Sequence, residues 1–256
     1  MSTQQLTVTV LGSSTPYPSV DNPCSGYLVR SASSTIWMDA GTGTLAPLQR
    51  HTTLEALDAI WISHLHADHS ADLLTAFYAL VWADVHRNKP VPLYGPPGIA
   101  QRLEDYLTNG ATRAPISAAF EVHELYDGHE ALVGDVTLST RAVSHGIPAF
   151  GVRISSPTTS LAFSGDTAPC DSLIDLAQNC DALLCESEST AAPEHEPQVH
   201  HTPEDTGATA RHARAKRLIV THVGRFLTPH EATTRAAENY PGPIDFAAPG
   251  ATFIIG

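Results

Sequence analysis

The sequence predicts an α+β fold in which two β-sheets lie between layers of helices. Strand-like segments outnumber helix-like segments by about two to one, and they come in runs that are broken by single helices. Two sheets packed face to face, with helices on their outer faces, account for that order. Hydrophobic residues make up 42 % of the 256 residues, enough for a substantial core, and 16 % of charged residues is low for a disordered chain.

The first strand is predicted from Leu6, Val8 and Val10, which alternate with polar residues before Gly12. Comparable apolar or alternating runs predict the further strands Gly26–Arg30, Thr35–Asp39, Ala59–Ser63, Val91–Tyr94, Phe120–Leu125, Val136–Val143, Phe150–Ser155, Ser160–Ser164, Ala182–Cys185, Leu218–His222, Asp245–Ala248 and Thr252–Ile255.

Helices are predicted from apolar spacing and from their starting residues. Thr202–Ala215 and Thr228–Tyr240 both open with a threonine cap followed by proline in the first turn. The other predicted helices are Ser70–Val85, Pro97–Leu107 and Asp171–Asn179.

No repeat, charge block or linker divides the chain, so we expect residues 1–256 to form a single domain. The longest unbroken apolar run, Ala76–Ala83, has eight residues, whereas a membrane span needs roughly 18. The N-terminus also lacks the basic and then apolar pattern of a signal segment. We therefore expect a cytoplasmic protein without a membrane segment. Its four cysteines lack the spacing of a zinc finger and are expected to be free thiols.

The charge of the chain disfavours long polyanions as ligands. Fourteen lysines and arginines stand against 27 acidic residues, which gives a net charge of −13. Nucleic-acid binders normally show a basic stripe, because contacts with phosphate supply most of their affinity. The one tight basic cluster consists of Arg211, Arg214, Lys216 and Arg217. A single phosphate could still be held by a local patch or by bound metal.

The strongest indication of function is the segment His64-Leu65-His66-Ala67-Asp68-His69, which directly follows the predicted strand Ala59–Ser63. Four metal-capable side chains within six residues rarely arise by chance in a chain of this composition. On a loop between a strand and a helix, His64 and His66 can converge on one ion, while Asp68 and His69 face a second. Zinc accepts imidazole nitrogen and carboxylate oxygen together. A loop that merely capped a helix would need one aspartate and not three histidines.

Three further metal-capable residues stand at the ends of apolar strands. His145 comes after Val136–Val143, Asp166 follows Leu161–Gly165, and His222 ends its strand. Taken singly, each is more often a buried polar residue with a satisfied hydrogen bond. Together with the histidine-rich segment, they predict one site at the mouth of the sheets.

On these residues the chain resembles the metallo-β-lactamase-fold hydrolases, and within them the branch of ribonuclease Z and phosphodiesterases. The resemblance spans nearly the whole chain and has further anchors in Asp39-Ala40-Gly41, Ser144–Gly151, Ser164–Thr167, His201-Thr202 and Thr221-His222. It implies a four-layer αββα sandwich and a site for two Zn²⁺ ions, with Mn²⁺ or Fe²⁺ as substitutes. By position it implies that His64, His66 and His145 hold the first zinc, that Asp68, His69 and His222 hold the second, that Asp166 bridges both, and that Asp39 orients ligands through hydrogen bonds.

Such a site suits the hydrolysis of a phosphodiester. Two divalent ions roughly 3.5–4 Å apart hold both the attacking and the leaving oxygen, and they supply a metal-bridging hydroxide near neutral pH. The leaving alkoxide needs a proton or a contact with metal, and His201 is our candidate for the proton donor. The expected catalytic residues are therefore Asp68 and His201. The His-Ser-Thr or His-Thr motif of related enzymes favours His201 over His200 but leaves His200 open. Glu186 is expected to support His201.

The interval between His145 and Asp166 bears on the size of the substrate. The ribonuclease Z family carries a long arm there for gripping transfer RNA, whereas only 20 residues separate the two positions here, many of them in a predicted hairpin. With the acidic charge, this favours a small phosphodiester. The chain also resembles the compact atypical class II cyclic-nucleotide phosphodiesterases, which makes a 3′,5′-cyclic nucleotide the favoured substrate.

Three alternatives stay open. The first is a ribonuclease Z-like endonuclease that processes the 3′ end of transfer RNA; the basic cluster and Arg225-Phe226, which resembles an Arg-Tyr pair of that family, speak for it. The second is a sulfatase or lactonase that uses the same metals, and the third is a metal-binding protein without turnover. Nucleic acid is therefore an unfavoured partner but not an excluded one. A homodimer is expected only by analogy with the family.

Overall fold

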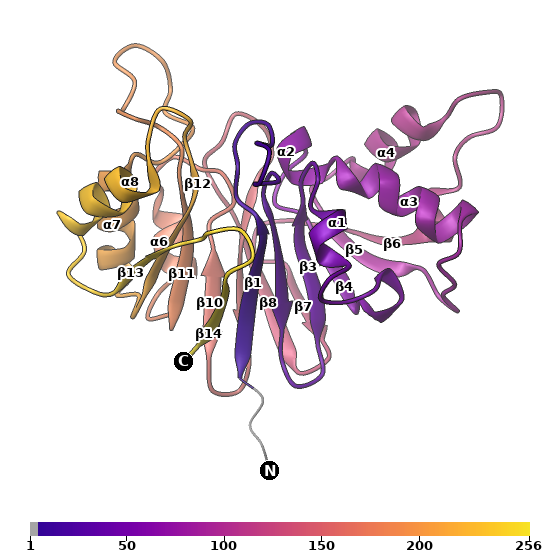
Figure 1. The fold of residues 1–256 in the computed structure, drawn as a ribbon, viewed down its shortest axis with the longest axis horizontal. Helices are drawn as coiled ribbons and strands as arrows, with labels where there is room; N and C mark the ends of the chain where they lie inside the picture. The colour runs from indigo at the N-terminus through magenta and orange to yellow at the C-terminus, as the bar shows by residue number, and fades with distance from the viewer. Residues whose placement is uncertain (1–4) are drawn as a thin grey trace.

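The computed structural model describes residues 5–256 and contains two seven-stranded sheets that pack face to face (Figure 1). The first sheet has the spatial order β14 (Thr252–Ile255), β1 (Leu6–Gly12), β2 (Gly26–Arg30), β3 (Thr35–Ala40), β4 (Ala59–Trp61), β5 (Val91–Gly95) and β6 (Phe120–Glu124). The second has the order β13 (Ile244–Phe246), β12 (Leu218–Val223), β11 (Ala182–Ser187), β10 (Ser160–Phe163), β9 (Phe150–Ser155), β8 (Val136–Ala142) and β7 (Glu130–Val133).

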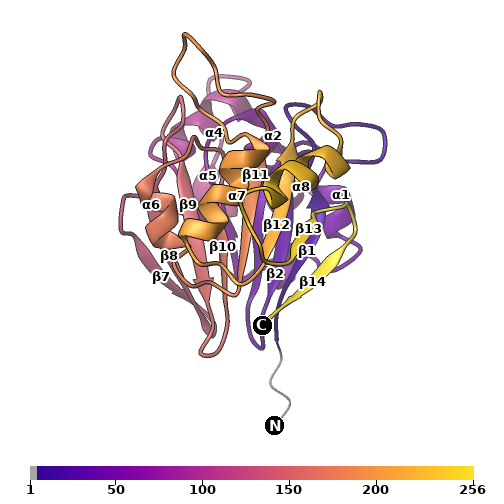
Figure 2. The same cartoon turned by 90° about the vertical axis from the view of Figure 1, so that its left-hand side faces the viewer.

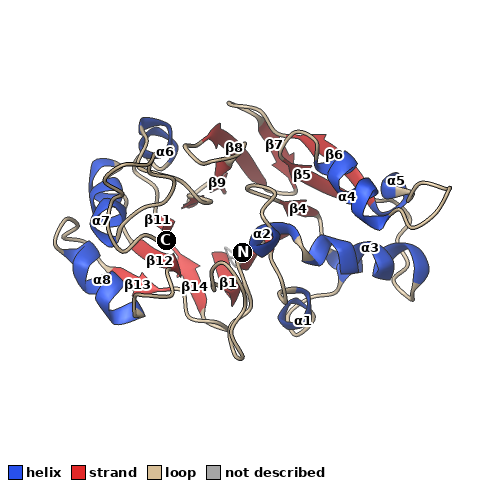
Figure 3. Ribbon diagram, turned by 90° about the horizontal axis from the view of Figure 1, so that it is seen from above, coloured by secondary structure: helices blue, strands red, loops and turns tan. Residues whose placement is uncertain are grey.

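Helices cover the outer face of each sheet, as the view from above shows (Figure 3). The first sheet carries α1 (Leu45–Leu48), a 3₁₀ turn (Leu54–Ala56), α2 (Ala67–Ser70), α3 (Asp72–Trp82), α4 (Ile99–Leu107) and α5 (Ile116–Ala119). The second sheet carries α6 (Asp171–Leu176), α7 (Pro203–His212) and α8 (Pro229–Ala237), which face the viewer in Figure 2. The predicted four-layer αββα sandwich is thereby confirmed.

The alternation of side chains along the central strands explains the layers. In β2, Tyr27 and Val29 face the space between the sheets, and Leu28 faces the helices on the other side. In β3, Met38 points inward and Trp37 outward. Successive strand residues point to opposite faces, so each sheet is apolar on both sides and needs a layer on each. A third apolar cluster joins the second sheet to α6, α7 and α8.

The structure differs from the sequence-based prediction mainly in short elements. The helices α1, α2 and α5 have four residues each, too few for a helical period to be visible in the sequence. Strand β7 was also not predicted, because its residues are largely exposed and Leu132 is 74 % exposed. The two Thr-Pro starts are confirmed: α7 and α8 each begin with a full capping box.

The direction of the parallel strands determines where the candidate functional residues lie. Strands β3, β4 and β5 run parallel to one another, as do β10, β11 and β12. The carboxyl ends of parallel strands meet at the same edge of a sheet. The loops that follow β4, β10 and β12 thus gather at one rim of the sandwich. Within residues 5–256, no helix has the length and apolar character needed to cross a membrane.

Candidate metal centre

Two groups of metal-capable side chains that share no residue meet at this rim. One group contains His64, His66 and His145, and the other contains Asp68, His69, Asp166 and His222. Within each group, one ligand atom from every residue lies within 4.8 Å of the others. These are the seven residues to which the sequence assigned metal binding, and the structure brings them together. A third group overlaps both and consists of His145, Asp166 and His200.

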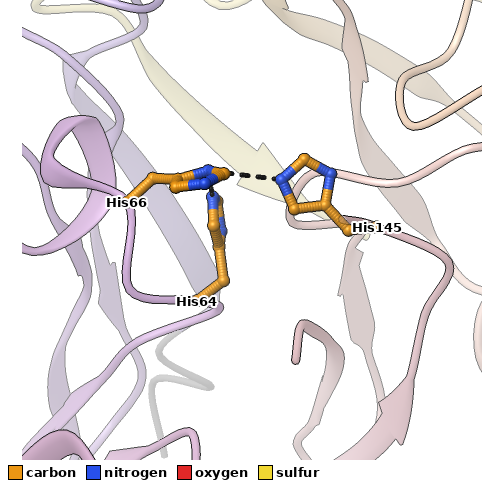
Figure 4. Close-up of side chains that lie close together, drawn as sticks. All are labelled: His64, His66 and His145. Atoms are coloured by element: carbon orange, nitrogen blue, oxygen red, sulfur yellow. Dashed lines mark hydrogen bonds between the residues drawn. The ribbon is translucent and has the colours of Figure 1, made fainter. Parts of the chain in front are cut away.

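The first group consists of three converging imidazoles (Figure 4). Nε2 of His64 lies 3.0 Å from Nδ1 of His66, and Nε2 of His145 lies 3.3 Å from that same Nδ1. His64 is fully buried, whereas His66 is exposed and His145 is half-buried. Three nitrogens aimed at one point from three backbone positions suit a borderline cation.

The second group is buried throughout and centres on Asp166. Nε2 of His69 lies 3.3 Å from Oδ1 of Asp166, and Nε2 of His222 lies 3.2 Å from its Oδ2. Oδ2 of Asp68 lies 3.7 Å from Nε2 of His69 and 3.8 Å from Nε2 of His222. Asp166 also reaches the first group, because its Oδ2 lies 3.7 Å from Nε2 of His64.

Orphaned polar atoms show that the donor set fits a metal. Nε2 of His69, Oδ1 of Asp166 and Nε2 of His222 are buried and find no hydrogen-bond partner among residues 5–256. Buried polar atoms are normally satisfied, since each unsatisfied one costs free energy. All three orphaned atoms face the centre of the second group, where a cation would bind them together.

The other ring nitrogen of four histidines is held by a hydrogen bond. Asp39 lies 2.7 Å from Nδ1 of His69 and accepts bonds from Ser63, whose hydroxyl lies 3.0 Å from Nδ1 of His64. Ser25 Oγ lies 2.8 Å from Nδ1 of His222. Nδ1 of His145 donates to the carbonyl oxygen of Val199, at 3.0 Å. Such bonds fix the orientation of a ligand histidine, and its tautomer where Nδ1 donates. Asp39 has the position expected from the sequence; Ser25, Ser63 and Val199 were not predicted.

The two groups have different electrostatics. Burial lowers the pKa of His64 well below its usual range, and the charge on His69 adds to that effect. Burial also disfavours the charged ring of His69, but Asp166 and Asp39 outweigh it and raise the pKa of His69 well above its usual range. Burial of Asp166 is likewise overcome: His222 and His69 hold the pKa of its carboxyl well below its usual range. Burial thus dominates at His64, whereas neighbouring opposite charges dominate at His69 and Asp166.

The backbone is strained at two of these positions. Asp39 and His222 adopt the left-handed conformation, with φ of 56° and 49°. Residues other than glycine avoid this region, and such strain persists only where the surroundings impose it. Close packing adds to the constraint, because a Cβ on Gly41 would lie 2.0 Å from the carbonyl oxygen of Asp68.

His201 does not face the metal centre, contrary to our prediction of a proton donor there. Its side chain is fully buried, Nδ1 lies 2.6 Å from the carbonyl oxygen of Thr167, and Nε2 lies 2.9 Å from the hydroxyl of Thr209. Both ring nitrogens are therefore occupied. The neighbouring His200 points to the centre instead: its ring centroid lies 5.1 Å from that of His145 and 6.3 Å from that of His222.

Glu186 supports His200 and not His201. Its Oε1 lies 3.0 Å from Nδ1 of His200 and accepts a 2.7 Å bond from the backbone N–H of Thr167. Burial disfavours the charged ring of His200, but Glu186 prevails and raises its pKa to about 9. The His-Ser-Thr form of the family motif could have identified the right histidine, since it aligns His200 with the motif histidine and His201 with its serine.

Comparison with known proteins agrees with this geometry. A sequence profile described as the beta-lactamase superfamily domain matches residues 34–223. The chain belongs to the metallo-β-lactamase superfamily. It is a metal-dependent hydrolase of the branch that contains ribonuclease Z and phosphodiesterases.

Relatives of this superfamily member align over nearly all of its length. The uncharacterized protein Rv1339 of Mycobacterium tuberculosis is 35 % identical, over 97 % of this chain and 92 % of its own. Ribonuclease Z of Mycobacterium bovis BCG is 31 % identical, over 94 % of this chain and 95 % of its own.

Solved structures show the same fold. The metallo-β-lactamase fold protein YhfI of Bacillus subtilis superposes with a TM-score of 0.85 at 23 % identity, over 98 % of this chain and 99 % of its own. Yeast PDE1 superposes with a TM-score of 0.70 at 15 % identity, over 98 % of this chain and 100 % of its own.

Proposed function

We propose that this metallohydrolase cleaves a small phosphodiester at a centre of two metal ions, and that a 3′,5′-cyclic nucleotide is its substrate. His64, His66 and His145 would hold one ion, and Asp68, His69 and His222 the other, with Asp166 between them. Zn²⁺ suits this mixture of imidazole and carboxylate best, and Mn²⁺ or Fe²⁺ could replace it.

The observation that carries the proposal is the compact connection between His145 and Asp166. Strands β9 and β10 take up much of it and pair directly, from Ser160 with Ser155 to Phe163 with Val152. Their turn is closed by bonds between Ser156 and Thr159. No residues are left in this connection for an arm that could grip a folded RNA.

His200 is suited to supply the proton that the leaving oxygen needs. Bound metal ions would neutralise the phosphate and activate water for attack. Glu186 holds Nδ1 of His200, which leaves Nε2 to carry a proton, and the ring lies beside His145 of the first group and His222 of the second. A proton at Nε2 could pass to the leaving alkoxide, while Glu186 stabilises the ring.

The basic cluster gives little support to the alternative of transfer-RNA processing. It runs from the last turn of α7 to Arg217, the residue before β12, and His222 lies near the end of that strand, five residues or about 16 Å from Arg217. Two of its members are also paired with acids: Lys216 lies 2.8 Å from Asp181, and Arg217 lies 2.6 Å from Asp245. The alternative keeps the support of Arg225-Phe226 and of the 31 % identity with a ribonuclease Z.

A paired assay decides between the two substrates. We expect the zinc-loaded protein to hydrolyse cyclic AMP with a KM that changes little with salt, because one phosphate is engaged. A precursor transfer RNA, assayed beside it, should be cleaved slowly or not at all. Cleavage of the RNA with an affinity that falls steeply between about 50 and 200 mM salt would overturn the proposal in favour of the endonuclease.

The same preparation tests the remaining alternatives. An aryl sulfate and a lactone, offered under the same conditions, should be turned over far more slowly than an activated phosphodiester. Elemental analysis should find two metal equivalents. A fully loaded protein that hydrolyses none of these esters would be a metal-binding protein and not an enzyme for them.

A further inference from the structure

Three consecutive residues, Val199, His200 and His201, are related to the metal centre in three different ways. The carbonyl oxygen of Val199 accepts a bond from Nδ1 of His145. His200 faces the space between the two ligand groups. The third residue, His201, turns the other way and enters the protein interior.

The hydrogen bonds of His201 define its tautomer. Because the carbonyl oxygen of Thr167 can only accept, Nδ1 carries the proton and donates to it. Nε2 pairs with the hydroxyl of Thr209 in α7. His201 thus links the loop after β10 to α7.

Thr167, which His201 holds, is the residue next to Asp166. Its backbone N–H donates to Glu186, and its hydroxyl accepts a 3.0 Å bond from the N–H of Ser144, the residue before His145. A second bond joins the same two segments: the N–H of Ala168 donates to the carbonyl oxygen of Ser144 at 2.7 Å. One threonine therefore ties together the segments that carry Asp166, His145 and Glu186.

We propose that His201 is a positioning residue, which acts through its bond to the Thr167 carbonyl oxygen and holds Asp166, His145 and His200 in register. Moving His201 would shift Val199, and with it the acceptor that orients His145; it would also release Thr167 beside Asp166. The inference rests on the proposed metal-dependent hydrolysis at this centre, but not on the identity of the substrate.

The two ring nitrogens can be tested separately. In His201→Asn, the side-chain amide can replace Nδ1 as donor to Thr167. In His201→Gln, the amide can reach Thr209 but not replace the Thr167 bond. Thr209→Val removes the hydroxyl partner of Nε2 and keeps the Thr167 bond, so it is the matched control for loss of buried hydrogen bonding.

Three quantities should be measured for each variant: the dissociation constant of Zn²⁺ by competition with a chromogenic chelator, kcat and KM for bis(4-nitrophenyl) phosphate, and Tm. We expect His201→Gln to weaken Zn²⁺ binding by about 10- to 100-fold and to lower kcat, the usual effect of losing a group that orients metal ligands. In His201→Asn and Thr209→Val, the Zn²⁺ dissociation constant and kcat should stay within about threefold of the values of the unmodified protein. All three variants should have a lower Tm.

Equal Zn²⁺ affinity and equal kcat in the Asn and Gln variants would overturn the proposal, as would losses that follow Tm across all three variants. The Zn²⁺ competition does not depend on turnover. If the unmodified protein hydrolysed no phosphodiester, the function proposed above would fail, while the difference between Asn and Gln in Zn²⁺ affinity would still support or refute the role of His201.

Discussion

The two halves of the metal centre differ in charge and in exposure. The first half contains three imidazoles, and His66 is exposed to solvent. The second half contains two carboxylates and two imidazoles, all buried. Buried charges persist only where other charges or metals pair with them. We therefore expect the second half to hold its ion more tightly, and the first half to exchange its ion more readily.

The groups behind the ligands repeat this difference. In the second half a buried carboxylate, Asp39, holds His69 at 2.7 Å, and the Ser25 hydroxyl holds His222. In the first half neutral groups hold the histidines: the Ser63 hydroxyl for His64 and a backbone carbonyl for His145. A carboxylate makes a histidine a stronger ligand than a neutral acceptor does. We therefore expect tight metal binding in the second half and readier metal exchange in the first half.

Removing Asp166, the residue that both halves share, should have the largest effect. We expect Asp166→Ala to lower turnover of an activated phosphodiester by about 10³-fold or more, because loss of a metal costs several kcal/mol of transition-state stabilisation. Metal content by elemental analysis should fall together with activity. Asp175→Ala, an exposed aspartate on α6, is the control and should change neither. A variant of Asp166 that retained both equivalents would refute its bridging role.

His200 lies beside both halves without being assigned to either as a ligand. We expect His200→Ala to keep its metal but to lower turnover about 10²-fold, the usual contribution of a general acid. His195→Ala is the control, because this histidine lies in the same connection between β11 and α7 and its side chain is 91 % exposed. Equal activity of the two variants would remove His200 from the mechanism.

Much of the centre could be predicted because its residues follow buried strands. Strands β4, β10 and β12 are buried and largely apolar, so their ends are visible in the sequence. The metal-capable residues come just after or at those ends. The family resemblance then distributed them between two ions, a distribution that strand periodicity alone does not give.

The proton donor could not be chosen in the same way. His200 and His201 are neighbours of the same chemical type, and only the turn of the backbone before α7 decides which one is buried. The groups that orient the ligand histidines are even harder to predict from local sequence patterns. Ser25 and His222 are 197 residues apart, and Val199 contributes a carbonyl oxygen that any residue would provide. Such contacts follow from the packing of the two sheets and not from a motif.

The carboxylate behind the second half can be neutralised with little change of shape. Asp39→Asn keeps the size of the side chain but removes its charge beside His69. We expect Zn²⁺ affinity to fall by about 10- to 100-fold, the usual cost of losing such a partner. Chelator competition would measure it. Of the two Zn²⁺-binding steps, the tighter one should weaken, so the difference in affinity between the halves should narrow or reverse. A loss confined to the weaker binding step would contradict our comparison.

The smallest effect should come from a neutral partner in the same half. Ser25→Ala removes the hydroxyl that lies 2.8 Å from Nδ1 of His222. A typical hydrogen bond contributes about 0.5–1.5 kcal/mol net, so Zn²⁺ affinity should fall only between about two- and tenfold. Ser187→Ala is the matched control, because its hydroxyl is also buried but has no hydrogen-bond partner within the described part of the chain. If Ser25→Ala lowered Zn²⁺ affinity as much as Asp39→Asn, the charge of the hydrogen-bond partner would not matter. The difference in affinity between the halves would then have to come from the ligands themselves.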